Sequence, residues 1–255
     1  MSTVLVTGAA GTIGTLLRRA WAGTHVLHCH DVAAPTVTLP GETWSRGDVT
    51  ALTVPPGVDV VVHLAANARP GVAWEELRHP NVDGTRHVFA ASVAAGVRTV
   101  VFASSHHAGG GYDRDRTPGV SARWPVRPCC FYGVTKTLGE SFGRYHADRD
   151  GLTVTCLRLG DVDVRPHDEL ALRIWLSHPD LVRAFDAALT RAPGFGTFLV
   201  SSRNSRSRWD VTEDNRLLGY APRDDAEDYT DLVGDAVSQQ DCFRGPVANP
   251  HAPGR

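Results

Sequence analysis

Lysine is nearly absent from this chain of 255 residues. Lys136 is the only lysine, and all the other residues in the combined lysine and arginine count are arginines. The basic and acidic residues almost balance, at 26 and 28, and the arginines are scattered along the sequence. The chain therefore lacks the basic patch that a nucleic acid or an anionic membrane surface would require. We expect the partner to be a small molecule, with no nucleic acid and no membrane involved.

Long hydrophobic runs and a secretion signal are also lacking. No uncharged stretch reaches the roughly 18 residues that are needed to span a bilayer. Met1 leads directly into an apolar stretch, without the basic segment and the cleavage site of a signal peptide. These absences predict a cytoplasmic protein.

The cysteines lack the spacing that a disulfide framework or a cysteine zinc site would show. They are odd in number and include no C-x-x-C motif: Cys29, Cys129, Cys130, Cys156 and Cys242. We therefore expect reduced, mostly packed thiols and no metal. The adjacent pair precedes a predicted helix, and we interpret it as two loop residues rather than a regulatory site.

Short β-branched runs alternate with amphipathic segments over the first 160 residues. The predicted strands lie at 3–7, 25–30, 58–65, 98–105 and 152–159, and the predicted helices lie at 12–22, 73–95 and 131–148. Strands that are apolar on both faces and separated by helices indicate a parallel sheet covered on both sides. We predict an α/β fold with a doubly wound parallel sheet, of the Rossmann type.

The pattern loosens after residue 160, which suggests a change in organisation. We predict that residues 1–160 form a dinucleotide-binding core and that residues 161–240 form a small C-terminal substrate lobe folded onto it. This lobe would contribute a further strand near 196–201 and a further helix near 178–191. The Pro- and Gly-rich residues 241–255 are predicted to be a flexible tail.

A glycine loop joins the first predicted strand to the first predicted helix in "VLVTGAAGTIGTLL". Gly8, Gly11 and Gly14 allow a tight turn and a close approach of backbone N–H groups to a pyrophosphate. Asp31 ends the second strand 17 residues after Gly14, where a carboxylate can accept hydrogen bonds from the adenosine ribose and repel a 2′-phosphate. NAD is therefore the expected cofactor. Asp48 either contacts the adenine or is a simple turn residue.

Tyr132 and Lys136 lie four residues apart in "YGVTK", so a helix places them on one face. A tyrosine needs its pKa lowered by about 3 units, or about 4 kcal/mol, to act as a base near neutral pH. We expect the ammonium of Lys136 and a bound nicotinamide to supply this. A compact lysine cation suits this position better than a planar guanidinium. Ser105 ends a predicted strand, where its hydroxyl could bond the reacting oxygen.

Together these motifs resemble the extended short-chain dehydrogenase/reductase family: "TGAAGTIG", Asp31, "HLAA" at 63–66, "NVDGT" at 81–85, "ASS" at 103–105 and "YGVTK" at 132–136. The resemblance implies Tyr132 as the catalytic base, Lys136 as its electrostatic partner, Ser105 as a hydrogen-bond donor, and Asn81 as a helper that kinks its helix and holds a water. The cofactor contacts that we expect are Gly8, Gly11, Thr12, Ile13, Gly14, Asp31, Asp48, Val49, Leu64, Ala65, Ala66 and Lys136.

Within that family the chain looks most like uronate dehydrogenases, through "SSHHAGGGY", "PVRPCCFYGVTKTLGE" and "RPHDELALRIWLSHPDL". Those enzymes oxidise the anomeric C1 of a hexuronic acid to a lactone. The substrate pocket departs from the subgroup, because Leu170 stands where the carboxylate-binding arginine is expected and an acidic residue, Asp161, would repel an acid. The expected substrate contacts are Ser105, His106, His107, Tyr132, Asp161 and Arg173, the last as a substitute arginine.

Three functions remain open at this point. The first is an NAD-dependent dehydrogenase that acts on a hydroxyl of a small, sugar-like substrate. The second is an epimerase or dehydratase that retains its NAD, and the third is a non-enzymatic NAD sensor. The resemblance also implies a homo-oligomer that pairs through the predicted helices at 73–95 and 131–148.

Overall fold

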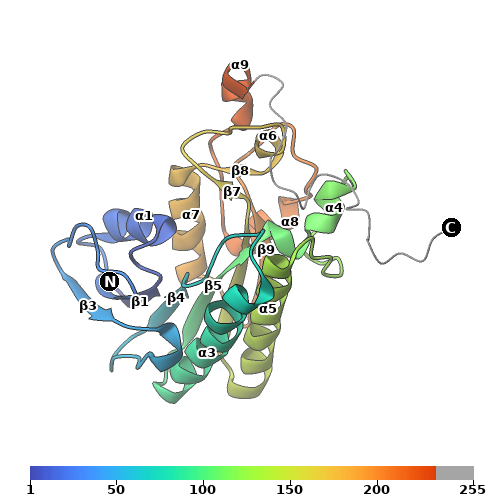
Figure 1. The fold of residues 1–255 in the computed structure, drawn as a ribbon. Coiled ribbons are helices and arrows are strands. Elements are labelled where there is room, and N and C mark those ends of the chain that lie inside the picture. The colour runs from blue at the N-terminus through green and yellow to red at the C-terminus, as the bar shows by residue number, and fades with distance from the viewer. Residues whose placement is uncertain (234–255) are drawn as a thin grey trace.

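Within the described residues, 1–233, seven parallel strands form one sheet in the order β3-β2-β1-β4-β5-β6-β9 (Figure 1). The sheet comprises β1 (Thr3–Thr7), β2 (Val26–Asp31), β3 (Glu42–Arg46), β4 (Val60–His63), β5 (Thr99–Ser105), β6 (Thr153–Leu159) and β9 (Phe195–Val200). This computed structural model confirms the predicted doubly wound fold. The predicted tail at 241–255 and the end of the predicted lobe at 234–240 lie outside the described residues.

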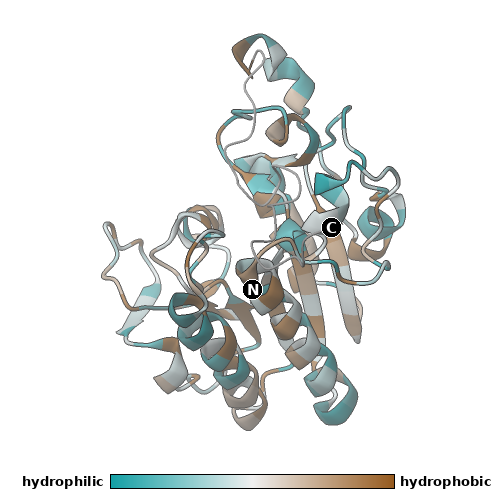
Figure 2. Ribbon diagram, turned by 45° about the vertical axis from the view of Figure 1, so that its right-hand side comes forward, coloured by the Kyte–Doolittle hydropathy of each residue, from teal (hydrophilic) through white to brown (hydrophobic). Residues whose placement is uncertain are grey.

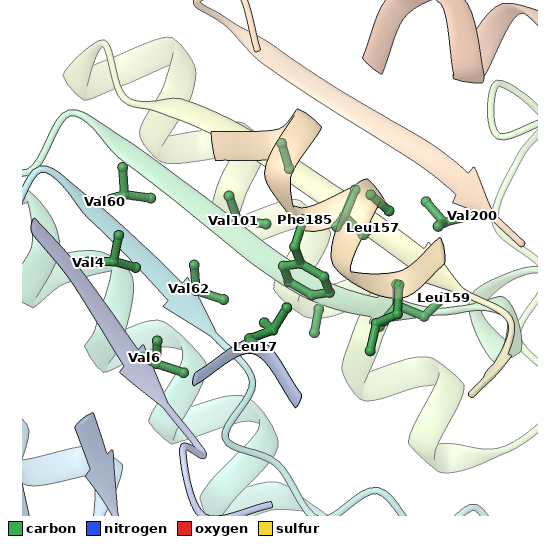
Figure 3. Close-up of a cluster of buried hydrophobic side chains, with 14 of the residues drawn as sticks. Val4, Val6, Leu17, Val60, Val62, Val101, Leu157, Leu159, Phe185 and Val200 are labelled. Atoms are coloured by element: carbon green, nitrogen blue, oxygen red, sulfur yellow. The ribbon is translucent and has the colours of Figure 1, made fainter. Parts of the chain in front are cut away.

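Two layers of helices cover the sheet because its central strands are apolar on both faces. On one side, α1 (Thr12–Trp21) packs against α7 (His178–Leu189). Figure 3 shows Leu17 of α1 and Phe185 of α7 pointing toward valines of several strands. Both side chains are fully buried, and each such burial contributes about 1.5–3 kcal/mol.

The opposite side of the sheet carries α3 (Gly84–Ala94) and α5 (Phe131–Asp150), which pack side by side. Their shared core includes Phe89 of α3 and Phe102 of β5, with ring centroids 6.3 Å apart. Gly139 of α5 lies directly over Phe102, since a Cβ there would be 2.3 Å from the ring. Figure 2 shows the strands as mainly hydrophobic, whereas these two helices also carry hydrophilic residues.

The predicted helix at 73–95 is interrupted rather than regular. It consists of α2 (Trp74–Leu77), a π-helical segment η2 (Arg78–Asp83) and then α3. Asn81 lies in the π-helical segment and is buried. A wider turn of this kind commonly marks a functional position in a helix.

The C-terminal part of the chain divides between the core and a smaller layer. α7 and β9 belong to the main helix and sheet layers, whereas a two-stranded sheet of β7 (Asp161–Val162) and β8 (Trp175–Leu176) lies above the sheet. The other short elements are η1 (Val49–Ala51), η3 (His106–Ala108), α4 (Gly110–Arg114), α6 (Ala171–Ile174), α8 (Thr212–Leu218), η4 (Ala226–Tyr229) and α9 (Thr230–Val233). Among residues 1–233, no helix has the length and apolar content to cross a membrane.

Candidate active site

A cavity of about 980 Å³ runs along the carboxyl ends of the strands, from the glycine loop to the start of α5. The strand order reverses on either side of β1, which pairs with both β2 and β4. Ligands of doubly wound folds bind at this switch point. Every expected site residue except Asn81 and Arg173 lines the cavity. The structure therefore brings the expected cofactor and substrate residues together along one cavity, apart from these two.

The glycine loop packs tightly at the start of α1 and lines one end of the cavity. Gly8 has a φ of +71°, and a Cβ there would lie 2.7 Å from the backbone nitrogen of Ala65. A Cβ on Gly14 would lie 2.5 Å from the carbonyl oxygen of Gly8. The N-cap residue of α1 is Gly11, and no side chain caps its first turn. The exposed N–H groups and the helix dipole fit a pyrophosphate.

Asp31 shapes the next part of the cavity. Its carboxylate accepts hydrogen bonds from the backbone N–H of Ala10, at 2.9 Å, and of Ala33, also at 2.9 Å. The side chain thus ties the glycine loop to the end of β2 and faces the cavity. This arrangement fits an adenosine ribose, because its hydroxyls can donate hydrogen bonds to the carboxylate.

Asp48 also lines the cavity, but the structure favours its turn role. Its carboxylate caps η1 by accepting hydrogen bonds from the N–H and the hydroxyl of Thr50, at 2.8 and 2.7 Å. These hydrogen bonds hold the pKa of Asp48 at about 2, with a smaller contribution from His79 at 3.1 Å. The carboxylate is therefore charged at neutral pH and keeps its place beside Val49.

Tyr132 and Lys136 face the other end of the cavity from the first turns of α5. Both are buried, and the Lys136 Nζ lies 5.5 Å from the centroid of the Tyr132 ring. The ammonium donates a hydrogen bond to the carbonyl oxygen of Ala103 at 2.8 Å, which fixes it against the end of β5. Ser105, at the end of the same strand, forms a hydrogen bond with the Tyr132 hydroxyl. The three side chains therefore meet at one point.

The expected acidification of Tyr132 does not hold in the protein alone. Burial raises the pKa of Tyr132 well above 10, and the hydrogen bond from Ser105 offsets only part of this increase. Burial also lowers the pKa of Lys136 to about 8, although the negative charge of Glu140 opposes that shift. Desolvation of the phenolate outweighs the help of a neighbouring ammonium, because burial disfavours the charged form of both groups.

A buried ion pair supports this end of the site, and the sequence did not reveal it. Arg158 of β6 donates to both carboxylate oxygens of Glu140 on α5, each at 2.8 Å. Ser104 donates to the same carboxylate at 2.6 Å. Glu140 follows Lys136 by one helical turn and thus connects the lysine with β5 and β6. The spacing Tyr132, Lys136, Glu140 places these three side chains on one helix face, but it does not identify Arg158 as the partner of Glu140.

Asn81 does not reach the cavity but holds one of its walls. Its side-chain oxygen accepts from the backbone N–H of Asn67 at 2.7 Å, and its nitrogen donates to the carbonyl oxygen of Asn67 at 3.0 Å. The same nitrogen donates to the Thr135 hydroxyl on α5 at 3.1 Å. Asn81 therefore connects the cavity loop after β4 with the helix that carries Tyr132 and Lys136.

Two adjacent histidines, His106 and His107 in η3, line the cavity beside Ser105. Their rings are 4.3 Å apart, and the His107 ring contacts the Tyr132 ring edge-on at 5.5 Å. Burial lowers the pKa of His107, and the adjacent His106 adds to the decrease. His107 is therefore neutral at physiological pH and can exchange hydrogen bonds with a substrate.

Asp161 and Arg173 lie in different environments. Asp161 lines the cavity directly after β6, and burial raises the pKa of its carboxyl group, with His167 opposing the shift from 3.5 Å. Arg173 on α6 lies outside the cavity lining, with its Nη1 3.7 Å from Glu169. Leu170 is buried in an apolar cluster with Trp209. The structure therefore does not bring the substitute arginine to the cavity.

Comparison with known proteins identifies relatives over most of the chain. A family model described as the NAD dependent epimerase/dehydratase family matches residues 4–163. A uronate dehydrogenase of Pseudomonas putida is 34% identical over 237 residues, which cover 90% of this chain and 87% of the relative. An L-arabinose 1-dehydrogenase of Haloferax volcanii, named as NAD(P)⁺-dependent, is 34% identical over 256 residues, with 89% and 98% covered.

Solved structures agree with these sequence relatives. The crystal structure of a uronate dehydrogenase from Agrobacterium tumefaciens superimposes with a TM-score of 0.83 at 29% identity, covering 91% of this chain and 88% of the other. A variant of that enzyme, complexed with NAD, gives a TM-score of 0.84 at 28% identity, covering 94% and 93%. These similarities confirm NAD as the cofactor and NAD-dependent dehydrogenase activity as the chemistry expected from the sequence.

Proposed function

The chain belongs to the NAD-dependent epimerase/dehydratase family, and we propose that it is a dehydrogenase of a free sugar that prefers a neutral aldose to a uronate. The observation that carries this proposal is the convergence of Tyr132, Lys136 and Ser105 at one end of a cavity whose other end is a phosphate-binding glycine loop. Substrate and dinucleotide can therefore meet beside a hydroxyl group that accepts and donates protons.

Tyr132 is the proposed proton acceptor in the oxidation of a sugar hydroxyl. Ser105 already bonds the Tyr132 hydroxyl and lies at the end of β5, so it can also bond the reacting oxygen. Burial favours the neutral phenol in the protein alone, so Tyr132 must first release its own proton to solvent before it can accept the proton of a sugar hydroxyl. The positive charges of Lys136 and of a bound nicotinamide would favour that release. Lys136 stands close enough to stabilise the phenolate during the transfer.

Residues of the glycine loop and Asp31 would hold NAD⁺, which supplies a hydride acceptor when it is bound. The positive end of α1 would face its pyrophosphate, and Ala65 and Ala66 would contact it from the end of β4. Asn81 acts as a positioning residue here, because it fixes Asn67 in the same loop. Asp48 and Val49 close the adenine end of the cavity.

The preference for a neutral sugar rests on the charge at the substrate end. Asp161 is the acidic side chain there, and Arg173 lies outside the lining. A substrate carboxylate would meet the charge of Asp161 without Arg173 to offset it, which is a repulsive arrangement. Arg69, in the loop after β4, does line the cavity, but Asp161 lies at the end that holds Tyr132. An aldose hydroxyl, in contrast, can donate a hydrogen bond to Asp161. One relative is named for L-arabinose and another for uronate, so both classes are reasonable substrates to test.

NADH formation with NAD⁺ and a panel of pentoses, hexoses and hexuronates tests the proposal directly. We expect turnover with at least one aldose and a kcat/KM for the matching uronate that is lower by about tenfold or more, or about 1.4 kcal/mol. The Asp161→Asn variant should narrow that ratio. No turnover with the panel would refute dehydrogenation of a free sugar, and NAD that copurifies and survives dialysis would instead indicate an epimerase.

The quaternary and cellular setting follows as a further part of this proposal. We propose a cytoplasmic homo-oligomer that pairs through α3 and α5, because these neighbouring helices share one face of the sheet. Residues 161–233 would supply the substrate lobe through β7, β8 and α6, whereas α7 and β9 complete the core. Light scattering on the purified protein measures the oligomeric state, and a monomer at micromolar concentration would contradict the pairing.

A further inference from the structure

Three side chains of types that can bind a metal ion meet at the start of α5, beside the reaction centre. They are His107 of η3 and the adjacent Cys129 and Cys130. The His107 Nδ1 lies 3.2 Å from the Cys129 Sγ and 3.5 Å from the Cys130 Sγ, and all three ligand atoms lie within 4.8 Å of one another. We propose that these residues form a binding site for a soft divalent cation such as Zn²⁺.

The distances from the His107 nitrogen to the two sulfur atoms are close to those of a zinc site. With Zn–S bonds of about 2.3 Å and Zn–N bonds of about 2.0 Å, the ligand atoms of a tetrahedral site lie about 3.5–3.8 Å apart. The two nitrogen-to-sulfur distances are already within a few tenths of an ångström of that range. Thiolate and imidazole are the ligands that zinc prefers, and the fourth position would remain open to water.

The backbone holds this arrangement in place. The N–H of Cys129 donates to the carbonyl oxygen of His107 at 3.3 Å, which pins the cysteine segment to η3. Gly133 makes the approach possible, because a Cβ there would lie 2.4 Å from that same carbonyl oxygen. The N–H of Gly133 points at the Cys130 Sγ from 3.5 Å. An amide at a helix N-terminus stabilises the negative sulfur that binds a metal.

The position of the site predicts what a bound ion would do. Both cysteines are half-buried, so an ion can enter from solvent. The His107 ring lines the cavity and contacts the Tyr132 ring, and Cys130 precedes Tyr132 by two residues. An ion would therefore immobilise His107 and the first turn of α5, and we expect it to inhibit sugar oxidation. That consequence rests on the proposed dehydrogenase activity, whereas binding itself does not.

A titration of the reduced, chelator-treated full chain tests the binding. We expect one Zn²⁺ per chain by calorimetry, and Co²⁺ used as a spectroscopic probe should give thiolate-to-metal charge-transfer absorption. Cys129→Ser and Cys130→Ser should each weaken Zn²⁺ binding by at least about tenfold. The matched control is Cys29→Ser, which changes a buried thiol of β2 outside the cluster and should leave the affinity unchanged. Cys242, outside the described residues, is replaced by serine in all proteins.

Two results would overturn the site. One is equal Zn²⁺ affinity for the parent protein and the Cys129→Ser/Cys130→Ser double variant, with both proteins folded by circular dichroism. The other is a Co²⁺ complex without thiolate charge transfer. Chelator-reversible loss of NADH formation in the parent protein, but not in the double variant, would support the inhibitory role. If no sugar is oxidised, the calorimetric and spectroscopic results still decide whether the metal site exists.

Discussion

The two ends of the cavity are built in different ways. At the dinucleotide end, the backbone does most of the binding, through Gly8, Gly11 and Gly14 and the uncapped start of α1. At the substrate end, side chains from β5, η3, α5 and β6 converge on Tyr132. The first end depends on the absence of side chains in a short segment. The second depends on buried polar groups that are distant in sequence, so changes at the two ends should have separable effects.

The largest expected effect comes from Tyr132→Phe, which removes one hydroxyl from the substrate end. We expect kcat to fall by about 10³-fold, since a positioned acid or base contributes about 10²–10⁴. The affinity for NAD⁺, measured by fluorescence or calorimetry, should change by less than about threefold, or about 0.6 kcal/mol. A loss of NAD⁺ affinity as large as the fall in kcat would contradict the proposed difference between the two ends of the cavity, because it would mean that the two ends are not independent.

Sequence reasoning describes features that are contained in a short segment better than features that join distant segments. The glycine loop and the Tyr132–Lys136 spacing are contained in short segments, so their geometry follows from the strand-to-helix connection and the helical period. The Glu140–Arg158 pair joins residues 18 apart on a helix and a strand. The contact of His107 with Cys129 joins residues 22 apart, one in η3 and one in the segment before α5. Neither pairing has a local signal.

The expected pKa of Tyr132 failed for a related reason. The sequence places a lysine one turn away and suggests an acidic phenol, but it does not reveal how completely both groups are buried. The structure shows that burial raises the pKa of Tyr132 and lowers that of Lys136. Arg173 illustrates the same limit. Its spacing from Leu170 is about one helical turn, yet α6 directs it to Glu169 rather than to the cavity.

The next largest effect should follow from Glu140→Gln, which tests the side-chain network of the substrate end. The variant leaves the buried guanidinium of Arg158 without a charged partner. Removing one member of a buried ion pair costs about 3–5 kcal/mol, so we expect the free energy of unfolding to fall by about 3 kcal/mol. Urea denaturation measures it.

The double variant Glu140→Gln/Arg158→Met is the matched control for this pair. It also removes the unpaired charge of Arg158 and should recover part of the lost free energy of unfolding. A Glu140→Gln protein as stable as the parent would show that the network does not hold the substrate end together.

A smaller effect should appear in the pH dependence of stability, through Lys136. Its pKa is lowered to about 8 in the folded protein, from 10.5 for an ordinary lysine. Between these values the unfolded chain holds a proton that the folded chain has lost, so stability should rise with pH in this window. From about pH 8 to about pH 9.5 the contribution is about 2 kcal/mol.

The Lys136→Met variant isolates this contribution, because every other titrating group is shared with the parent. Denaturation of both proteins across the window should give a difference in unfolding free energy that grows in favour of the parent as the pH rises. A constant difference would show that Lys136 keeps its ordinary pKa despite its burial at the substrate end.

The smallest effect concerns two glycines of the dinucleotide end that differ in their need to lack a side chain. Gly8→Ala forces a left-handed φ on alanine and places its Cβ 2.7 Å from the nitrogen of Ala65, whereas Gly11→Ala meets only the carbonyl oxygen of Gly8 at 3.3 Å. The strain at Gly8 costs about 1–2 kcal/mol, so NAD⁺ affinity should fall by about tenfold more for Gly8→Ala than for Gly11→Ala, as calorimetry can measure. In both variants, Glu140→Gln should lower the free energy of unfolding as much as it does in the parent protein, because no side chain of the glycine loop contacts the Glu140–Arg158 pair. Equal losses of NAD⁺ affinity for Gly8→Ala and Gly11→Ala would show that the loop can adapt to a side chain at Gly8. Backbone geometry would then not explain the difference between the two ends of the cavity.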